Sequence, residues 1–350
     1  MRLSRALTTT ALLGAIATAV SFTAACGGTG SSGSDEQTVT VYSADGLDNW
    51  YKTQFEKFEA ETGISVNLVA AGSGEVVNRV EKEQSNPQAD ILVTLPPFIQ
   101  KADASGLLQP LGVDTSAYPA EEKDPNGKFV SLAGNYLNFI ANSSIDPSGL
   151  TWDDLLKPEF EGKLQYSTPG QAGDGTAVLI LLQELRGKEG ALEYLKQLQA
   201  NNVGPSSSTG KLQPKVDKGE LLIANGDIQM NMESITSKGS KFQIFFPESA
   251  DGKQHTVSLP YVMGLTKGAP NAEAASKLME FLLSKEVQRT LGPDAFAVSP
   301  RTDLTEPQAT GSTPTPASLL RGVEIVYPDW NAVVNDLNSD VAAYEKAIGG

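Results

Sequence analysis

The stretch TVTVYSADGLDNWYKTQFEKFEAETGISVNLVAAGSGEVV, residues 38–77, alternates two kinds of hydrophobic pattern. Thr38–Tyr42 and Ile64–Ala70 are short runs rich in β-branched residues, and such runs predict strands. Between them, Asn49–Thr62 spaces its aromatic side chains along one face of a helix, which Gly63 ends. The order strand, helix, strand is typical of parallel strands joined by a crossover helix.

The same alternation continues beyond this stretch. Gly72–Gly74 opens a second helix, Ala89–Leu95 predicts a third strand that Pro96-Pro97 ends, and Phe98–Ala104 predicts a third helix. A polar, Pro- and Gly-rich break at residues 114–128 then separates this unit from the rest of the chain. Residues 38–104 therefore predict one α/β unit.

The remainder of the chain predicts a second unit of the same class. Extended segments near residues 135–142 and 256–265 connect the two units. Two α/β units, each with a mainly parallel sheet flanked by helices, and two connections are the layout of a two-lobe binding protein. The elements predicted in this part include helices at Gly173–Arg186, Gly190–Gln199, residues 319 to about 326 and Trp330–Ile348, and a strand at Gln229–Met232.

The amino terminus predicts export and anchoring. Arg2 and Arg5 precede an apolar run at residues 11–20, which is too short for a membrane span, and small residues lead to Cys26, the only cysteine. Residues 1–25 are therefore expected to be a signal peptide. Cys26, followed by two glycines, resembles a bacterial lipoprotein processing site. This predicts a lipidated Cys26 at the outer face of the cytoplasmic membrane, with a flexible Gly/Ser-rich tether at 26–37. An ordinary cleavage site with an incidental cysteine is the alternative.

The composition is acidic. The 42 Asp and Glu residues outnumber the 27 Lys and Arg, for a net charge of −15, and loss of the signal peptide would remove two more positive charges. Such a surface repels nucleic acid and anionic lipid, so neither is expected as a partner, and membrane contact is expected only through the anchor. With one histidine, His255, and one cysteine, we expect no metal site and no cofactor.

The candidate site residues lie in loops where a predicted strand ends and a helix begins, the place where open α/β sheets bind ligands. Glycine lets the backbone approach a ligand, a helix N-terminus attracts an anion, and hydroxyls add donors. Any one loop could be an ordinary cap or turn, so the prediction is that at least two of them converge on a ligand. The candidates are Ser43, Asp45, Ser73, Gly74, Thr94, Ser167, Asp174, Thr176, Ser207, Ser208, Thr209, Glu233 and Tyr261.

Motifs that would indicate an enzyme fail on inspection. Gly204–Lys211 lacks the spacing of a phosphate-binding P-loop and is followed by Leu212 where a Ser or Thr is required. Ser208–Lys211 fits the S-x-x-K pattern, but its partner motifs do not follow. His255 lies in a polar turn, which favours a surface residue. We expect a binding protein that catalyses nothing; a secreted hydrolase and a structural lipoprotein are the alternatives.

Three motifs carry a family resemblance. Val41–Leu47, Ala71–Val77 and Asn86–Val93 resemble the family 1 extracellular solute-binding proteins of ABC importers, and the likeness spans nearly the whole chain after the signal peptide. Ala71–Arg79 and Thr94–Asp103 are most similar to the 2-aminoethylphosphonate-binding branch, which is related to the iron(III)- and thiamine-binding branches.

The resemblance implies a type II periplasmic-binding-protein-like fold with the ligand in the cleft between the lobes. Lobe 1 would comprise residues 38–138 and 262–350, and lobe 2 residues 139–261. The implied partners are 2-aminoethylphosphonate or a similar phosphonate, an ABC permease and its ATPase. The phosphonate suits the Ser/Gly/Thr loops, and the ammonium needs a carboxylate, for which Glu233 and Asp45 rank ahead of Asp174.

Other ligands of the same family remain open. They are another small anion, thiamine and ferric iron. The iron branch usually has two neighbouring tyrosines late in the chain, whereas Tyr261 and Tyr327 are far apart here, which counts against iron. Thiamine would need an aromatic sandwich.

Overall fold

The computed structural model describes residues 37–304 and 314–349. The predicted signal peptide, Cys26 and residues 26–36 of the tether lie outside the described residues. In the described part of the chain, no helix is both long enough and apolar enough to cross a membrane.

The first sheet combines strands from the beginning and the later part of the chain. Its order is β2-β1-β3-β11-β4, with β5 also paired to β11. The β1 strand pairs in parallel with β2 and β3, whereas β11 is antiparallel to β3, β4 and β5. The strands are β1 (Thr38–Ala44), β2 (Ser65–Ala71), β3 (Ile91–Thr94), β4 (Leu108–Gln109), β5 (Phe129–Ala133) and β11 (Tyr261–Thr266).

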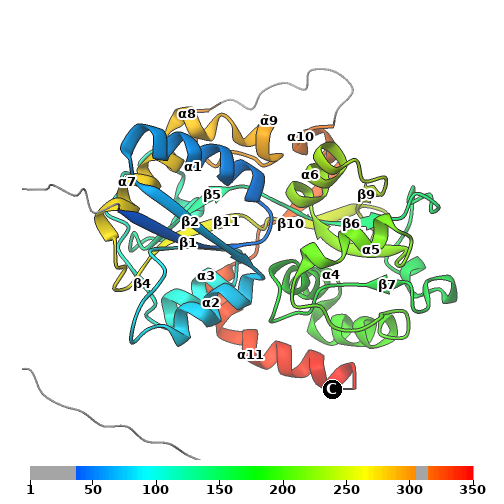
Figure 1. Ribbon diagram of the computed structural model, residues 1–350. Coiled ribbons are helices and arrows are strands. Elements are labelled where there is room, and N and C mark those ends of the chain that lie inside the picture. Colours follow the sequence, from blue (N-terminus) through cyan, green and yellow to red (C-terminus); the bar gives the residue numbers. More distant parts are fainter. Residues whose placement is uncertain (1–36, 305–313, 350) are drawn as a thin grey trace, which may run out of the picture. The chain divides into compact units, whose positions relative to one another are not determined.

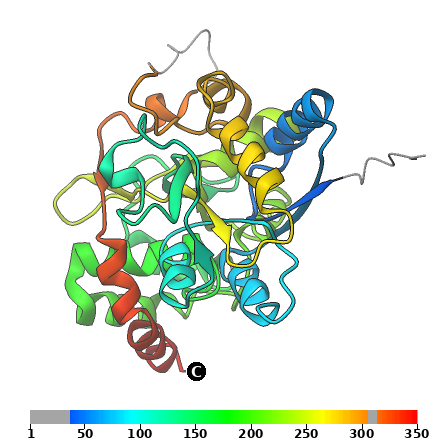
Figure 2. The same ribbon diagram turned by 90° about the vertical axis from the view of Figure 1, so that its left-hand side faces the viewer.

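Helices cover both faces of this sheet (Figures 1 and 2). Val39 and Val41 share a core cluster with aromatic residues of α1 (Asp48–Thr62), while Tyr42 belongs to a second cluster with α2 (Ser73–Lys82) and α3 (Phe98–Ala104). Alternate residues of one strand therefore enter two separate cores, as the period of a strand requires. The remaining helices of this unit are α7 (Ala272–Leu283), α8 (Lys285–Gln288) and α9 (Leu291–Ala295).

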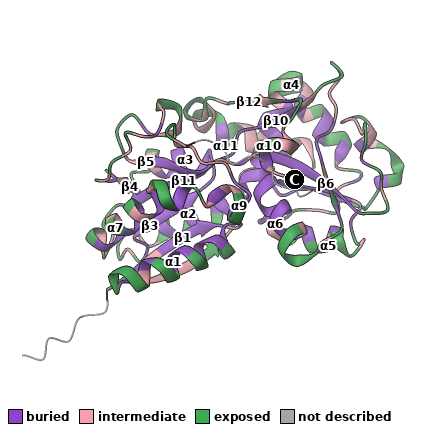
Figure 3. Cartoon of the chain, turned by 90° about the horizontal axis from the view of Figure 1, so that it is seen from above, coloured by how far each residue is buried: buried purple, intermediate pink, exposed green. Residues whose placement is uncertain are grey.

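The second sheet is built from the middle of the chain. Its order is β7-β8-β6-β9, in which β7 and β8 are parallel and the other two pairs are antiparallel. The strands are β6 (Leu137–Ala141), β7 (Leu164–Gln165), β8 (Ile223–Asp227) and β9 (Gln243–Phe245), with α4 (Gly173–Leu198), α5 (Gln213–Asp217) and α6 (Ile228–Lys238) around them. Figure 3 shows buried strands, such as β1 and β6, with exposed helix surfaces outside them.

The α/β class and the two sheet units are as predicted, but the pairing within each sheet is mixed where a mainly parallel pattern was expected. The β1-α1-β2-α2-β3 run has crossover helices and is parallel. In contrast, β6 and β11 enter their sheets straight from the connecting segments and run antiparallel to their neighbours. Parallel pairing requires a crossover connection that carries the chain back to the end of the sheet at which the previous strand began. A strand that is reached without such a connection can run antiparallel to its neighbours.

The segments between the sheets form a small structure of their own. The β10 strand (Gln254–Val257) pairs in parallel with β12 (Val323–Val326). The chain passes from one sheet to the other between β5 and β6 and between β10 and β11. After α10 (Pro316–Leu319) and β12, the final helix α11 (Trp330–Ala347) contacts both α4 and α3.

Two predicted elements are wrong, and a predicted pair of helices is separated by a kink, as expected. Gln229–Met232, predicted as a strand, lies in α6, because Asp227 accepts a hydrogen bond from Met230 N (2.8 Å) and caps a helix there. Residues 319–326, predicted as a helix, contain the end of α10 and then β12. The helices predicted at Gly173–Arg186 and Gly190–Gln199 are confirmed as two helical segments of α4, because Gly187 between them has a non-helical backbone (φ 71°, ψ 166°).

Candidate functional site

Loops at the carboxyl ends of strands from both sheets meet in one place. Gly74 N donates to Gln171 O (3.0 Å), Asn49 Nδ2 donates to Glu233 Oε1 (2.6 Å), and Ser208 donates to Asp45 through their side chains. Each contact joins a residue of the first sheet's unit to one of the second sheet's unit. Strand-end loops of both sheets therefore lie together, while their convergence on a ligand stays a prediction.

Two glycines allow this close approach. Gly46 has φ 133°, and a side chain there would overlap the Tyr261 hydroxyl and lie 2.6 Å from Gln229 Oε1. A Cβ at Gly74 would lie 2.7 Å from Gln171 O. Neither contact is compatible with a real Cβ atom, so a substitution at Gly46 or Gly74 would push the two loop sets apart.

Three aspartates gather where the loops meet. Asp45 follows β1, Asp174 lies in the first turn of α4, and Asp227 ends β8. Asp174 is 2% exposed and Asp227 is fully buried. Among the described residues, no group forms a hydrogen bond of normal geometry with Asp174 Oδ1 or Asp227 Oδ2, although the Thr209 hydroxyl and the Asn135 amide lie near enough to lower the pKa values of the two carboxyls. In residues 37–304 and 314–349, no lysine or arginine forms an ion pair with any of the three.

Burial without a cation changes the proton affinity of these carboxyls. It raises the pKa of Asp45, and a hydrogen bond from Ser208 opposes that rise. Burial raises the pKa of Asp174 to about 6; the nearby Thr209 hydroxyl opposes this rise, and the charge of Asp45 reinforces it. Burial and then the charge of Asp174 raise the pKa of Asp227 well above its usual range. The three carboxyl groups are therefore unfavourable to ionise at the same time unless a cation binds next to them.

Hydroxyl and amide groups surround the aspartates. Thr209 Oγ1 and Asn225 Nδ2 both donate to Ser167 Oγ (3.0 and 3.1 Å). Tyr261 Oη donates to Asp45 O (2.9 Å) and contacts Gln229 Oε1 (3.3 Å). The site thus combines acceptors that lack a partner with a polar network that fixes their positions.

A pocket of about 370 Å³ opens beside Asp45, and neither Asp174 nor Asp227 lines it. Lys211 and Lys238 line it together with Asp45 and Glu233. Glu233 already accepts hydrogen bonds at both carboxylate oxygens, from Asn49 at one and from Gln229 Nε2 (3.1 Å) at the other. Burial still raises the pKa of Glu233.

Several predicted site residues have partners within their own loop or sheet. Ser43 Oγ donates to Ala44 O (3.0 Å), and Thr94 Oγ1 donates to Ser73 O (3.0 Å). Thr176 Oγ1 donates to Ala172 O (2.8 Å) and accepts from Gly170 N (2.9 Å), so it shapes the loop before α4. Ser207 Oγ accepts from Lys211 Nζ (3.3 Å).

Four residues of the polar network were not among the candidates. They are Asn135, Asn225, Asp227 and Gln229. The triplet Asn225-Gly226-Asp227 before a helix is the usual chemistry of a strand-to-helix turn and could have been found. The mistaken strand at Gln229–Met232 hid that helix start. Asn135 lies in a connecting segment, and nothing in the sequence distinguishes it.

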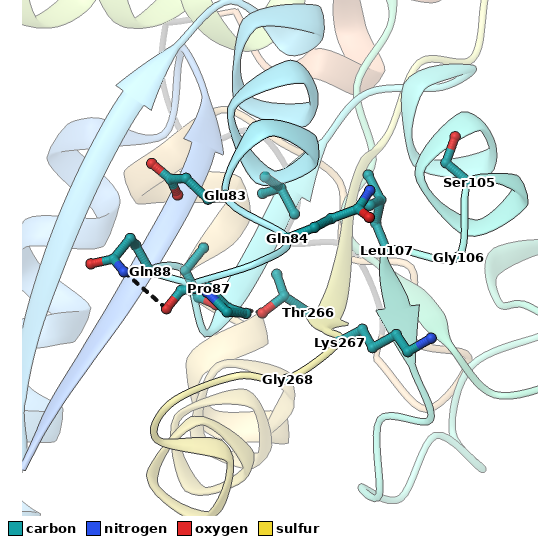
Figure 4. Close-up of a pocket in the computed structure, with 12 residues that line it drawn as sticks. Glu83, Gln84, Pro87, Gln88, Ser105, Gly106, Leu107, Thr266, Lys267 and Gly268 are labelled. Atoms are coloured by element: carbon teal, nitrogen blue, oxygen red, sulfur yellow. Dashed lines mark hydrogen bonds between the residues drawn. The ribbon is translucent and has the colours of Figure 1, made fainter.

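A second pocket, of about 550 Å³, lies away from this site (Figure 4). It is lined by the segment before β3, the turn after α3 and the turn after β11, so it faces the amino end of β3 and not the carboxyl end. Glu83, on its wall, is already held by Tyr42 and Arg79. Nothing in its lining matches the unpartnered carboxylates of the cleft.

The single histidine takes part in an ion-pair group. His255 Nε2 lies 3.3 Å from Glu324 Oε2 and 3.5 Å from Asp251 Oδ2, and Lys253 also pairs with Glu324. The side chain is 8% exposed, more buried than its polar turn suggested, because β12 packs beside it. The group pairs two basic side chains, Lys253 and His255, with two exposed carboxylates, Asp251 and Glu324. We therefore interpret it as an ion-pair network at the surface.

Comparison with known proteins gives consistent matches. The model of the family described as bacterial extracellular solute-binding protein matches residues 43–289. A protein of Salmonella typhimurium, provisionally named a 2-aminoethylphosphonate-binding periplasmic protein, is 45% identical over 318 residues, covering 89% of this chain and 92% of the relative. Iron uptake protein A1 of Synechocystis is 26% identical over 278 residues, covering 75% of each chain.

Solved structures share the fold. The ferric binding protein of Campylobacter jejuni superposes with a TM-score of 0.70 at 24% identity, covering 88% of this chain and 99% of that one. AfuA of Actinobacillus pleuropneumoniae, solved with fructose-6-phosphate, gives 0.73 at 18% identity, covering 89% and 98%. These likenesses establish a two-lobe periplasmic binding protein fold of type II.

Proposed function

Because this chain belongs to the bacterial extracellular solute-binding protein family, we propose that it captures 2-aminoethylphosphonate, or a similar small organophosphonate, for import. The observation that carries the proposal is the meeting of strand-end loops from both sheets around buried carboxylates that lack a partner. A ligand with an anionic end and a cationic end matches that combination. The 45% identity to the Salmonella relative favours this ligand over others of the family.

The anionic end has suitable donors nearby. The α2 helix begins at Ser73 and α4 begins at Gly173, and both starts lie at the meeting point of the loops. The first N–H groups of a helix have no partner within it and attract an anion. We assign the phosphonate to these helix starts and to the hydroxyls of Ser73, Ser208 and Thr209, with Gly74 providing close backbone approach. Ser208 and Thr209 donate to Asp45 and Ser167 in this structure, so both hydroxyls would turn to the phosphonate when it binds.

The two sheets support a proposal for closure. Residues 38–138 with 262–350 would form lobe 1 and residues 139–261 lobe 2, joined where β5 leads to β6 and where β10 leads to β11. The final helix α11 contacts α3 of one sheet unit and α4 of the other, so it is placed to follow a change in the angle between the lobes. Ligand would bind between the lobes and draw them together.

The partners and the location complete the proposal. The loaded protein would deliver its ligand to an ABC permease and its ATPase without transforming it. Cys26, if lipidated, would hold the protein at the outer face of the cytoplasmic membrane, because a diacyl anchor adds enough buried methylene groups for stable attachment.

Ferric iron fits the described site less well. Iron as a hard ion favours phenolate and carboxylate oxygens gathered at one point. Tyr261 lies in the site, but its hydroxyl donates to Asp45 O, and Tyr327 is 68% exposed. The late tyrosines therefore do not form a pair.

Calorimetry tests the proposal. The protein is first unfolded, freed of bound ligand and refolded. We expect binding of 2-aminoethylphosphonate and about a hundredfold weaker binding of ethylphosphonate, which lacks the amine, because removing one partner of a buried charge pair costs ~2–5 kcal/mol. Native mass spectrometry of freshly purified protein supplies an independent identification. Binding of thiamine or ferric iron, with no binding of any phosphonate, would falsify the ligand assignment and leave the family intact.

A further inference from the structure

The carboxylates of the site fall into two kinds. Glu233, at the pocket, has a protein partner at each oxygen. Asp174 and Asp227, both buried, have no cationic partner among the described residues: one oxygen of each forms no hydrogen bond of normal geometry, and only the neutral Thr209 hydroxyl and Asn135 amide lie near enough to lower their pKa values. An unpaired buried carboxylate is costly, and proteins keep such groups where a charged ligand supplies the missing partner.

The charges that face these two aspartates are almost all negative. Asp45 acts on Asp174, and Asp174 and Glu233 act on Asp227. Two buried phenols, Tyr51 and Tyr261, lie in the same region. Around this set the remaining charged groups are Asp48, Glu75, Lys211 and Lys238, which act on Asp45 or Glu233.

Neither lysine reaches the pair. Lys238 Nζ stands 4.0 Å from Glu233 Oε1, and Lys211 Nζ contacts Ser207. The protein thus has no internal cation for Asp174 and Asp227 in the part of the chain that the structure describes.

Asp45 belongs to the first sheet's loops, whereas Asp174 and Asp227 belong to the second sheet's unit. Asp45 is joined to the second unit through its hydrogen bond with Ser208, so a change in the angle between the two units would alter its distance from Asp174 and Asp227. From this geometry we propose that Asp174 and Asp227 form the cation subsite of the cleft, and that the same carboxylates with Asp45 oppose closure until a cation is bound. The first half rests on the proposed function, because it assigns the amine of a zwitterionic ligand; the second half does not depend on the ligand's identity.

The proton affinities agree with this arrangement. In this structure, where the two units are in contact, burial is the largest cause that raises the pKa values of all three aspartates. The contacting state therefore binds more protons than an open state with ordinary carboxyl pKa values. By linkage, closure without a cation becomes more favourable as the pH falls, and is opposed above about pH 6, where Asp174 ionises.

Asp227→Asn and Asp174→Asn test the proposal. Asparagine keeps the shape of the side chain and can still cap α6 at position 227, so the fold is expected to persist. Asp294→Asn, an exposed aspartate on α9, is the matched control. All variants are first checked by circular dichroism and thermal unfolding, and Asp174→Asn, which caps no helix, serves if Asp227→Asn does not fold.

Two measurements separate the two halves of the proposal. In calorimetry, each cleft variant should lose most of the roughly hundredfold preference for 2-aminoethylphosphonate over ethylphosphonate, because the ammonium loses a charged partner. In small-angle scattering of ligand-stripped protein at pH 7.5, each should have a smaller radius of gyration than wild type. Wild type should approach that smaller radius at pH 5, and Asp294→Asn should follow wild type in both measurements.

The outcomes are distinguishable. If wild type binds no phosphonate, the proposed function fails, but the scattering comparison still decides whether the aspartates oppose closure. If wild type shows the preference and both cleft variants keep it and keep the wild-type radius, the inference about Asp174 and Asp227 is wrong while the proposed function stands.

Discussion

The two sets of loops that meet in the cleft contribute different chemistry. The first sheet's loops supply backbone and small side chains, with Gly46 and Gly74 in contact with the opposite side. The second sheet's unit supplies most of the charge: Asp174, Asp227 and Glu233. This difference indicates that the loops of the first sheet determine how closely the lobes approach each other. The loops of the second sheet determine which charge on a ligand can be bound.

Gly46→Val should cause the largest loss of ligand affinity, because it interferes with the close contact between the two sets of loops. A side chain at Gly46 would collide with Tyr261 and Gln229 in the closed cleft. We expect an affinity loss of about five- to a hundredfold, since the overpacking costs ~1–3 kcal/mol where the two sets of loops are in contact. The strain of valine at a positive φ is present with and without ligand, so it should lower the thermal stability instead. Calorimetry measures the loss; Gly149→Ala, at positive φ but in open space, is the control. An unchanged affinity would show that the lobes close differently.

Glu233→Gln sharpens the comparison between carboxylates. Asn49 and Gln229 already satisfy its two oxygens, so the amine is expected to gain little from it directly. We expect at most a roughly tenfold loss for 2-aminoethylphosphonate, from removal of a charge near Asp227 in a partly solvated setting. A loss larger than that of Asp227→Asn, in the same calorimetric titration, would move the cation subsite to Glu233.

Acid should weaken binding of the zwitterion more than binding of its amine-free analogue. Burial raises the pKa of Asp174 to about 6, so this carboxyl gains a proton as the pH falls through that value and can no longer pair with an ammonium. The affinity should therefore hold above about pH 6 and fall by up to about tenfold per pH unit below it. The ratio of the two affinities is the useful readout, because both ligands share the phosphonate titration. A ratio independent of pH between 7 and 5 would contradict a role for Asp174.

Ser73→Ala and Thr209→Ala should have smaller effects, equal for both ligands. Each removes a neutral donor proposed to face the phosphonate, and such a hydrogen bond contributes ~0.5–1.5 kcal/mol, or about two- to tenfold in affinity. Thr209→Ala also removes a hydrogen bond to Ser167, so its stability should be compared by thermal unfolding. Loss confined to 2-aminoethylphosphonate would place these residues at the amine end instead.

Cys26→Ala should not change affinity at all. Its expected effect is on location, because the unlipidated protein loses the acyl chains that hold it at the membrane. Fractionation of cells should find the variant released or left unprocessed, while the purified domain binds the same ligand. A processed variant that stays membrane-bound would rule out anchoring through this residue.

The sequence alone determined the class of fold, because the hydrophobic periodicity of short stretches predicts strands and helices. The β-α-β-α-β run at residues 38–94, the glycines after strands and the absence of a complete catalytic motif needed no knowledge of distant contacts. The loop positions around Asp45, Ser73, Ser167 and Ser208 also followed, since strand ends of a sheet lie at one edge.

Only the tertiary structure decided which carboxylates lack a partner. Glu233 ranked ahead of Asp174 in sequence, and Asp227 was missed, because partners such as Asn49 for Glu233 come from distant segments. Whether a carboxylate is buried and hydrogen-bonded depends on how the two sheets pack against each other. Each sheet is built from distant parts of the chain, so a local sequence pattern cannot predict this packing. The same reason explains the antiparallel strands: β6 and β11 take their direction from the connecting segments and their neighbours, not from their own residues.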